Sequence, residues 1–344
     1  MADASPIPSR MSAAAPTHSV APAVTASAPA SLSASASASA SPSESSASPA
    51  PTETIPAMPA VAPYLDITAD ADVKEIHKKT GLTDFTLAFV LADSSGECTP
   101  TWGGTTALNN STVQARIDKI DAFGGDVIVS TGGADGTYLE SVCSQKQLVA
   151  AYKKALDAAG SNHLDVDIEQ DVDNDTVIGA LAALQEDRNT AVTLTVPADG
   201  SAVGLTDESI ALLEDAKAGG VEVTVNAMTM NFDDAGEDWA TAITETTQAV
   251  HDDMAAIWSG RSDARISAML GITPMIGVND SGGVTTVANA RTVVSYAEKS
   301  GLGFVRFWSL NRDNGDCDDG ELSGACSGVD QSDYAFTKLF TDFE

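Results

Sequence analysis

Positive charge is scarce in this chain of 344 residues: 18 lysine and arginine residues stand against 49 aspartate and glutamate residues, a formal net charge of −31. A surface with this balance repels phosphate backbones and anionic lipid headgroups. We therefore expect neither nucleic-acid binding nor membrane insertion. A neutral polymer or a small molecule is the partner that this charge favours.

Cysteine is also scarce, with four residues at Cys98, Cys143, Cys317 and Cys326. None belongs to a CxxC pair or lies at ligand spacing from a histidine, so no zinc or other metal site is expected. An even number in a chain that we expect to be exported suggests two disulfides. Cys317–Cys326 would close a short loop and Cys98–Cys143 would join two loops, although four cysteines allow three connectivities.

Residues 12–60 lack aromatic side chains and carry almost no charge, and they consist mainly of alanine, serine, proline and threonine. Such a segment cannot bury enough apolar surface to offset its ordering entropy, so residues 1–59 are predicted to be a disordered linker or stalk. No apolar run of signal-peptide or membrane-spanning length precedes it, so either a targeting segment has been removed or the start lies within a longer reading frame. Linker, charge and cysteines together predict an extracellular protein.

From about residue 60, short apolar runs alternate with amphipathic stretches. The patterns predict strands at 62–67, 85–91, 126–131, 164–169, 191–196, 221–230, 265–272 and 303–308. They predict helices at 70–80, 111–123, 144–159, 172–187, 206–218, 238–259, 284–300 and 331–341. This alternation over roughly 280 residues is typical of the (β/α)₈ TIM barrel, an α/β fold. An open doubly wound sheet would show a glycine-rich phosphate turn after its first strand, and none is present, so no cofactor is expected.

The fourth predicted strand, residues 164–169, alternates three aliphatic residues with three acids. Asp165, Asp167 and Glu169 would lie on one face of this strand, about 6–7 Å apart. Three charges at this spacing repel one another, and a pocket of low dielectric constant relieves the repulsion by keeping one acid protonated. A carboxylic acid that stays neutral near pH 7 can act as a general acid. A solvated edge strand with its acids pointing outward is the alternative.

Chemistry in a barrel gathers at the C-terminal ends of the strands. Glu169 ends the fourth predicted strand, Gly132 and Gly133 follow the third, and Trp308 ends the eighth. The paired glycines allow the backbone to approach closely beside a pocket. A tryptophan face stacks on the C–H surface of a pyranose, so these strand ends predict a carbohydrate site.

These motifs resemble those of glycoside hydrolase family 18, the chitinases and their relatives. Residues 162–169 are similar to the family's DxxDxDxE signature. STGG at 130–133, MTMN at 228–231 and FWSLNRD at 307–313 fall where the family has its SxGG, MxMD-type and closing-tryptophan motifs. PYLDI, LAFVLA and the TWGG of 101–104 are similar to secreted bacterial chitinases of actinobacterial type. The resemblance extends over the whole predicted catalytic domain.

The resemblance implies a retaining hydrolase in which the acetamido group of the substrate is the nucleophile, a known exception to the two-carboxylate rule. Glu169 would protonate the glycosidic oxygen. Asp167 would orient the acetamido group and share a proton with Asp165 or Glu169. Trp308 would form the floor of the −1 subsite.

Three positions depart from the family pattern. Asn162 replaces the leading aspartate of the signature, and Asn231 and Phe232 stand where many members have Asp-Tyr. Phe232 lacks the hydroxyl that helps to hold the acetamido carbonyl, and losing one such donor costs about 10²–10³ in turnover. Tyr64, at the end of the first strand, is the candidate to replace it.

Other candidates are less specific. Met228 and Met230 are expected to line the pocket, and Trp102 is either a further sugar platform or loop packing. Acids in the segment 313–321 do not follow EF-hand spacing, so a solvated loop closed by a disulfide is favoured over a calcium site.

The sequence therefore predicts a (β/α)₈ catalytic domain at residues 60–344 that cleaves β-1,4-linked N-acetylglucosamine polymers as a monomer. An endo-β-N-acetylglucosaminidase acting on N-glycan cores is one alternative, because the same acids serve both reactions. A non-catalytic chitin-binding or inhibitor protein on the same barrel is another. Such proteins generally lose the catalytic glutamate or its aspartate partner, whereas Glu169 and Asp167 are both present.

Overall fold

The computed structural model of the chain describes residues 56–200, 203–232 and 238–344. Almost all of the predicted linker at 1–59 therefore lies outside the described residues. Within them, no helix combines the length and apolar character needed to cross a membrane.

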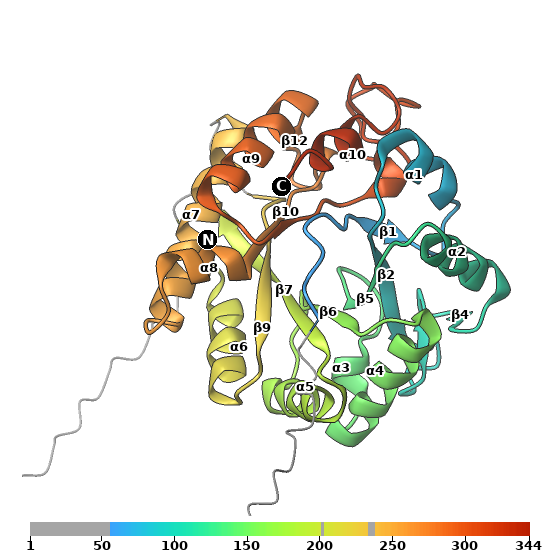
Figure 1. The fold of residues 1–344 in the computed structure, drawn as a ribbon, viewed down its shortest axis with the longest axis vertical. Helices are drawn as coiled ribbons and strands as arrows, with labels where there is room; N and C mark the ends of the chain where they lie inside the picture. The colour runs from blue at the N-terminus through green and yellow to red at the C-terminus, as the bar shows by residue number, and fades with distance from the viewer. Residues whose placement is uncertain (1–55, 201–202, 233–237) are drawn as a thin grey trace, which may run out of the picture. The chain divides into compact units, whose positions relative to one another are not determined.

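Eight parallel strands of the described chain form a barrel (Figure 1). They are, in order around the barrel, β1 (Tyr64–Asp66), β2 (Phe85–Ala92), β5 (Val127–Gly132), β6 (His163–Asp167), β7 (Ala191–Gly200), β9 (Val223–Met228), β10 (Leu270–Thr273) and β13 (Phe304–Val305). The barrel closes where Val61 bridges Val305 in parallel and the Tyr64 N–H donates to the Phe307 carbonyl at 3.1 Å. The predicted (β/α)₈ fold is confirmed.

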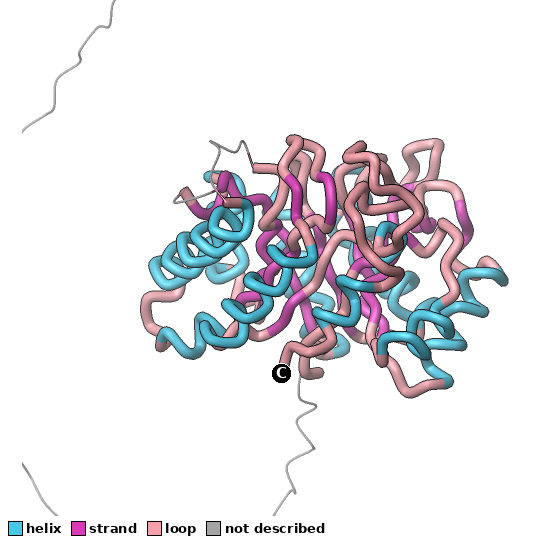
Figure 2. Tube along the Cα trace, turned by 90° about the horizontal axis from the view of Figure 1, so that it is seen from above, coloured by secondary structure: helices cyan, strands magenta, loops and turns pink. Residues whose placement is uncertain are grey.

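Helices surround the strands, as Figures 1 and 2 show. The predicted helices correspond to α1 (Val73–Thr80), α2 (Ser111–Ala122), α4 (Gln145–Ala159), α5 (Asn174–Arg188), α6 (Asp207–Ala218), α7 (Trp239–Ile257), α9 (Val287–Ser300) and α10 (Ala335–Phe340). Local signals set their ends. The Thr206 hydroxyl accepts the Ser209 N–H at 3.1 Å at the start of α6, and Gly160 ends α4 with φ of 64°.

One predicted strand is wrong over most of its length. Residues 265–272 begin as helix α8 (Asp263–Met269), and only then does the chain enter β10. Ser262 caps this helix, and its buried apolar side chains Ile266 and Met269 stand three residues apart. That spacing places both on one helical face, whereas the sequence pattern had been interpreted as a continuous apolar strand.

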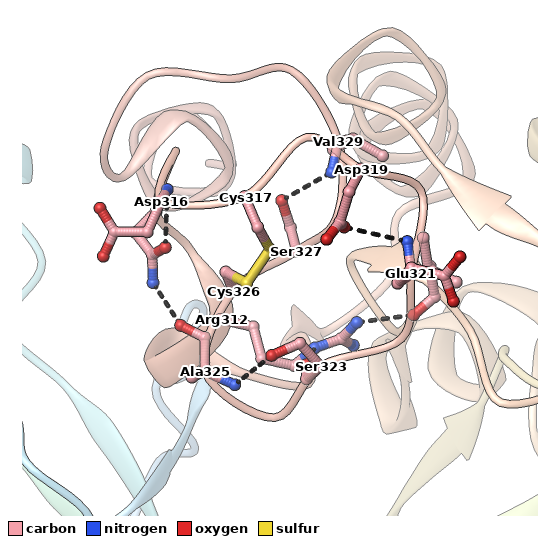
Figure 3. Close-up of a disulfide and its surroundings, with 12 residues drawn as sticks. Arg312, Asp316, Cys317, Asp319, Glu321, Ser323, Ala325, Cys326, Ser327 and Val329 are labelled. Carbon is pink, nitrogen blue, oxygen red and sulfur yellow. Dashed lines mark hydrogen bonds between the residues drawn. A yellow bond between two sulfur atoms is a disulfide. The ribbon is translucent and has the colours of Figure 1, made fainter.

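Further short elements lie at the ends of the barrel. They are β3 (Pro100–Trp102), β4 (Thr106–Ala107), α3 (Leu139–Val142), β8 (Gly204–Leu205), β11 (Gly277–Val278), β12 (Val284–Thr285) and the 3₁₀ helix η1 (Leu310–Arg312). Both predicted disulfides are confirmed: Cys98–Cys143, with Cα atoms 5.1 Å apart, and Cys317–Cys326, with Cα atoms 5.9 Å apart. Figure 3 shows the second bridge, in the loop between η1 and α10.

The fold has two distinct buried regions. Between strands and helices lies an apolar core of aliphatic and aromatic side chains. Inside the barrel, by contrast, most of the buried side chains are polar, and they come from all eight strands or their ends. Those used below are Tyr64, Ser130, Asp165, Asp167, Thr193, Thr195, Asn226 and Arg306. This polar interior holds the candidate site.

Candidate active site

A cleft of about 740 Å³ opens at the C-terminal ends of the barrel strands. Its walls come from loops that follow strands on every side of the barrel. The sequence-predicted residues that line it are Tyr64, Asp167, Glu169, Met228, Met230, Asn231 and Trp308. Chain segments far apart in sequence therefore meet at one opening, as expected for a barrel site.

Asp165 lies beneath the cleft and is completely buried. Its Oδ2 accepts hydrogen bonds from the Tyr64 hydroxyl at 2.9 Å and the Ser130 hydroxyl at 2.6 Å. Its Oδ1 accepts from the Thr195 hydroxyl at 2.6 Å and from Arg306 Nη1 at 2.9 Å. Four donors thus surround one carboxyl group, and one of them is the guanidinium of Arg306. Asp165 does not line the cleft, and its predicted catalytic part stays a prediction.

Arg306 is the cation that balances this charge, and sequence reasoning missed it. The side chain is fully buried, and its Nη2 donates to the Thr193 hydroxyl at 3.3 Å. Burial lowers the pKa of its guanidinium, but the neighbouring Asp165 and Tyr64 outweigh burial and raise the pKa overall. A signal was present: Arg306 stands two residues from both Phe304 and Trp308, so period 2 places all three on one face, the face on which Trp308 had been predicted to meet the site.

Asp167 lies one layer above Asp165 and is 4% exposed. Within the described residues, its Oδ1 has no hydrogen-bond partner. Burial raises the pKa of Asp167 well above its ordinary value, the charges of Glu169 and Asp165 add to the rise, and Arg306 opposes it. The site therefore contains a buried carboxyl group that holds its proton more tightly than an ordinary aspartic acid and has one oxygen without a partner among the described residues.

Glu169 follows the end of β6, is exposed and lines the open cleft. The cleft walls still displace much of the water around the carboxyl. This desolvation, with smaller contributions from the charges of Asp135 and Asp280, raises the pKa of Glu169 to about 7. An accessible carboxylic acid with this pKa can donate a proton near neutral pH.

Aromatic rings form one wall of the cleft. Trp308 stacks on Phe89, with ring centroids 5.5 Å apart and an interplanar angle of 17°, and lies 6.0 Å from the Tyr64 ring. All three rings line the cleft. Met228 and Met230 add apolar surface, as the sequence predicted for their side chains.

The Tyr64 hydroxyl is not free to replace the missing tyrosine at position 232. It donates to Asp165, accepts from Asn226 Nδ2 at 3.1 Å, and lies 3.0 Å from the Thr195 hydroxyl. Phe232 does not line the cleft: it is 5% exposed and packs on Trp239, with ring centroids 5.6 Å apart. Neither ring brings a free hydroxyl to the cleft.

Three predicted contact residues lie outside the cleft lining. Trp102 is completely buried in β3, so loop packing rather than a sugar platform is the interpretation that the structure supports. A Cβ atom on Gly132 would collide with the carbonyl oxygen of Asp167, and one on Gly133 would lie 2.6 Å from the Phe89 ring. The paired glycines therefore let β5 approach β6 and the aromatic wall closely, as the sequence predicted, and their contact with substrate stays a prediction.

Tyr138 is a second residue that sequence reasoning missed. Its buried hydroxyl accepts the backbone N–H of Glu169 at 3.1 Å and donates to the carbonyl of Gly133 at 2.5 Å. These bonds tie the residue that carries the accessible carboxyl to the end of β5. Because Glu169 lies beyond the last β6 residue, this hydroxyl helps to hold its backbone in place.

We expect Tyr138→Phe to lower kcat by about tenfold with little change in KM, since small displacements of a reacting group are costly. Loss of the two hydrogen bonds should also reduce the free energy of unfolding by about 1–3 kcal/mol. Tyr152→Phe is the matched control, because its buried hydroxyl donates to Glu140 at 2.8 Å and neither residue lines the cleft. Equal kcat losses in the two variants would contradict a positioning role for Tyr138.

Within the three described ranges, no group of three or more histidine, cysteine, aspartate and glutamate side chains is arranged to hold a metal ion. The acidic segment at 313–321 divides in two. Asp313 is buried and accepts N–H bonds from Phe336 and Thr337 at the start of α10, while its neighbours Asp316 and Asp319 face solvent or the disulfide loop.

The site and fold can now be compared with known proteins. No family model matches the sequence. The chain is 33% identical over 311 residues, 82% of its length, to "Probable bifunctional chitinase/lysozyme" of Escherichia coli. It is 32% identical over 282 residues, 73% of its length, to "Endochitinase 11" of Metarhizium anisopliae. These matches span 34% and 52% of the two relatives.

One solved structure matches the fold of this chain over nearly the whole length of that structure. Catalytic-site mutants of active domain 2 of a thermostable chitinase from Pyrococcus furiosus, complexed with chito-oligosaccharides, match with a TM-score of 0.77 and 32% identity. The match covers 84% of this chain and 96% of that one. The chain therefore belongs to the chitinases of glycoside hydrolase family 18.

Proposed function

We propose that this chain hydrolyses β-1,4-linked N-acetylglucosamine polymers with Glu169 as the general acid. The observation that carries this proposal is the pair of carboxyl groups at the cleft: Glu169, accessible and with a pKa of about 7, and Asp167, buried beside it. One long aromatic wall beside these acids suits the C–H faces of sugar rings. The family membership supports the same chemistry.

The geometry supports a substrate-assisted mechanism. The unused Oδ1 of Asp167 accepts the N–H of the acetamido group, which turns the acetamido carbonyl oxygen toward the anomeric carbon. That oxygen attacks while the bond to the leaving sugar breaks, and Glu169 gives its proton to the departing oxygen. Asp165 and Arg306 remain a buried charged pair throughout.

The second half of the reaction restores the acid. Water attacks the anomeric carbon of the oxazolinium ion from the side that the leaving group has vacated, and its proton passes to Glu169. The C–O bond to the acetamido oxygen breaks, and the product keeps the β configuration. No carboxylate nucleophile is required, which agrees with the full hydrogen bonding of Asp165.

Product analysis tests this function. N-acetylglucosamine oligomers of two to six units are incubated with the protein, and the first products are examined by NMR and mass spectrometry. We expect shorter oligomers whose new reducing ends are initially β. Release of N-glycans from a glycoprotein without oligomer cleavage would favour an endo-β-N-acetylglucosaminidase, and binding without any product would favour a lectin.

The pKa of Glu169 sets an expected pH profile. The general acid must be protonated, so kcat/KM should fall as the pH rises through about 7. Removing two nearby negative charges in Asp135→Asn/Asp280→Asn should move this basic limb to lower pH, because less repulsion opposes ionisation of Glu169. If the variant is active and its basic limb stays at the same pH, a group other than Glu169 is responsible for that limb.

We also propose that the protein is extracellular. Both of its disulfides are formed, and disulfides persist in oxidising compartments. The net charge of −31 keeps a protein dispersed in such an environment. Secretion can be tested by comparing activity in culture medium and washed cells of the native host.

A further inference from the structure

Arg312 reaches the cleft from the side opposite Glu169. It ends η1, which follows β13, and β13 is separated from β6 by three strands in either direction around the barrel. The side chain lines the cleft but is only 1% exposed. Burial lowers the pKa of its guanidinium to about 10, with the charge of Asp280 opposing the shift, so the group stays positive at neutral pH.

Two of the three guanidinium nitrogens are used by the protein. Nε donates to the Ser323 carbonyl at 2.8 Å and Nη2 donates to the Val278 carbonyl at 2.6 Å. Nη1 is buried and has no hydrogen-bond partner among the described residues. A charged donor without a partner in a desolvated position is costly, so an oxygen atom of a ligand in the cleft is its natural acceptor.

The loop held by Arg312 supplies a second, apolar contact. Leu322, Ser323 and Gly324 line the cleft, and Leu322 is 49% exposed there. The Cys317–Cys326 bridge closes this loop, and Asn314 Nδ2 donates to the Ala325 carbonyl at 2.7 Å (Figure 3). Disulfide and hydrogen bonds thus fix an exposed leucine beside a buried cationic donor.

The remaining walls restrict the class of ligand. Asp66, Asp135 and Asp280 also line the cleft, and their charges repel an anionic ligand. A neutral sugar unit presents both hydroxyl or carbonyl oxygens for Arg312 and C–H groups for Leu322. Such a unit therefore fits this corner better than a carboxylate or a phosphate.

We propose that Arg312 and the segment 322–324 form a carbohydrate subsite beyond the sugar held by Trp308, and that the disulfide-closed loop sets a preference for longer substrates. This inference rests on the proposed hydrolysis of N-acetylglucosamine polymers. Arg312 Nη1 donates to an oxygen of the bound unit, and Leu322 covers part of its C–H face. The unit occupies this corner only when the substrate is long enough to reach it.

The dependence of kcat/KM on oligomer length, from two to six units, tests the subsite. In the wild type, kcat/KM should rise at the length that first fills it. Leu322→Ala should reduce that rise by about fivefold and Arg312→Lys by about 10- to 100-fold. Cys317→Ser/Cys326→Ser should reduce it as well, because the loop is no longer closed.

Two controls separate this effect from general damage. Val142→Ala shortens another exposed aliphatic residue, and Cys98→Ser/Cys143→Ser opens the other disulfide; none of these residues lines the cleft. Both should keep the wild-type length dependence, whatever their thermal stability.

The outcomes distinguish the two proposals. A wild-type protein that cleaves no oligomer contradicts the proposed function itself. An active wild type whose length dependence is unchanged in Leu322→Ala and in Cys317→Ser/Cys326→Ser overturns the subsite. If Arg312→Lys fails to fold, these two variants still decide the question. An Arg312→Lys protein that folds but loses the same factor at every length removes Arg312 from the subsite.

Discussion

Replacing Glu169 by glutamine should lower kcat by about 10²–10⁴-fold, the usual contribution of a general acid. Glutamine has nearly the shape of glutamate but carries no proton that it can give to the glycosidic oxygen. The side chain is exposed at the cleft floor, so the fold should be preserved. Steady-state hydrolysis of a chromogenic chitobioside measures the loss, and thermal unfolding verifies that the variant is folded.

The pH dependence of the remaining activity of Glu169→Gln gives a second expected result. With Glu169 removed, the basic limb near pH 7 should disappear, because the group that titrates there is gone. Asp171→Asn is the matched control: this acid is exposed, stands two residues further along the chain, and does not line the cleft. It should retain wild-type kcat and the basic limb. Undiminished turnover in Glu169→Gln would remove the assignment of the acid.

The sequence was sufficient to predict the structural features that repeat along the chain or depend on neighbouring residues. Alternation of apolar and polar residues located most barrel strands, and the Thr206 and Gly160 signals marked helix ends that the structure confirms. The alternating acids on 164–169 identified a carboxylate ladder because a strand places every second residue on one face. The disulfide pairs agreed with the simplest connection of nearby loops.

The residues that sequence reasoning missed depend on long-range contacts. Arg306 meets Asp165 across 141 positions of the chain, and its partner could be named only once the barrel had closed. Tyr138 holds Glu169 by accepting its backbone N–H, and no side-chain motif in the sequence indicates such a contact. The sequence left two interpretations of Trp102 open, because its burial results from the packing of the β3 hairpin against the barrel.

Helix α8 shows a different limit of prediction from the sequence. Residues 265–272 contain enough apolar side chains to satisfy either a short buried strand or the start of an amphipathic helix. Periodicity over so few residues does not separate the two structures. The capping Ser262 and the contacts of Ile266 and Met269 with the core select the helix in the folded chain.

Replacing Arg306 by methionine should reduce the free energy of unfolding by about 3–5 kcal/mol, the expected cost of leaving one member of a buried ion pair alone. Arg306 and Asp165 are both fully buried and their charged atoms lie 2.9 Å apart. Methionine fills similar space but leaves the Asp165 carboxylate without a cation in the barrel interior. Chemical denaturation at pH 7 measures the loss, since it compares the folded and unfolded chains directly.

A second set of measurements tests whether the unpaired charge of Asp165 causes the loss of stability. Asp165→Asn/Arg306→Met should recover part of the stability, because asparagine carries no charge that needs the missing cation. Lys153→Met, which breaks the exposed pair with Asp187 at 2.6 Å, should cost about 1 kcal/mol or less.

The same variants separate stability from catalysis at this site. Arg306 lowers the pKa of Asp167, whose pKa is raised chiefly by burial, so its removal should strengthen proton retention by Asp167 as well as destabilise the fold. In Asp165→Asn/Arg306→Met, by contrast, the charge of Asp165 that raises the pKa of Asp167 is removed together with the charge of Arg306 that lowers it, so the two effects should partly cancel. If the pH profile of Arg306→Met equals that of the wild type, the buried pair acts only as structural support, and its charges do not tune the acids of the cleft.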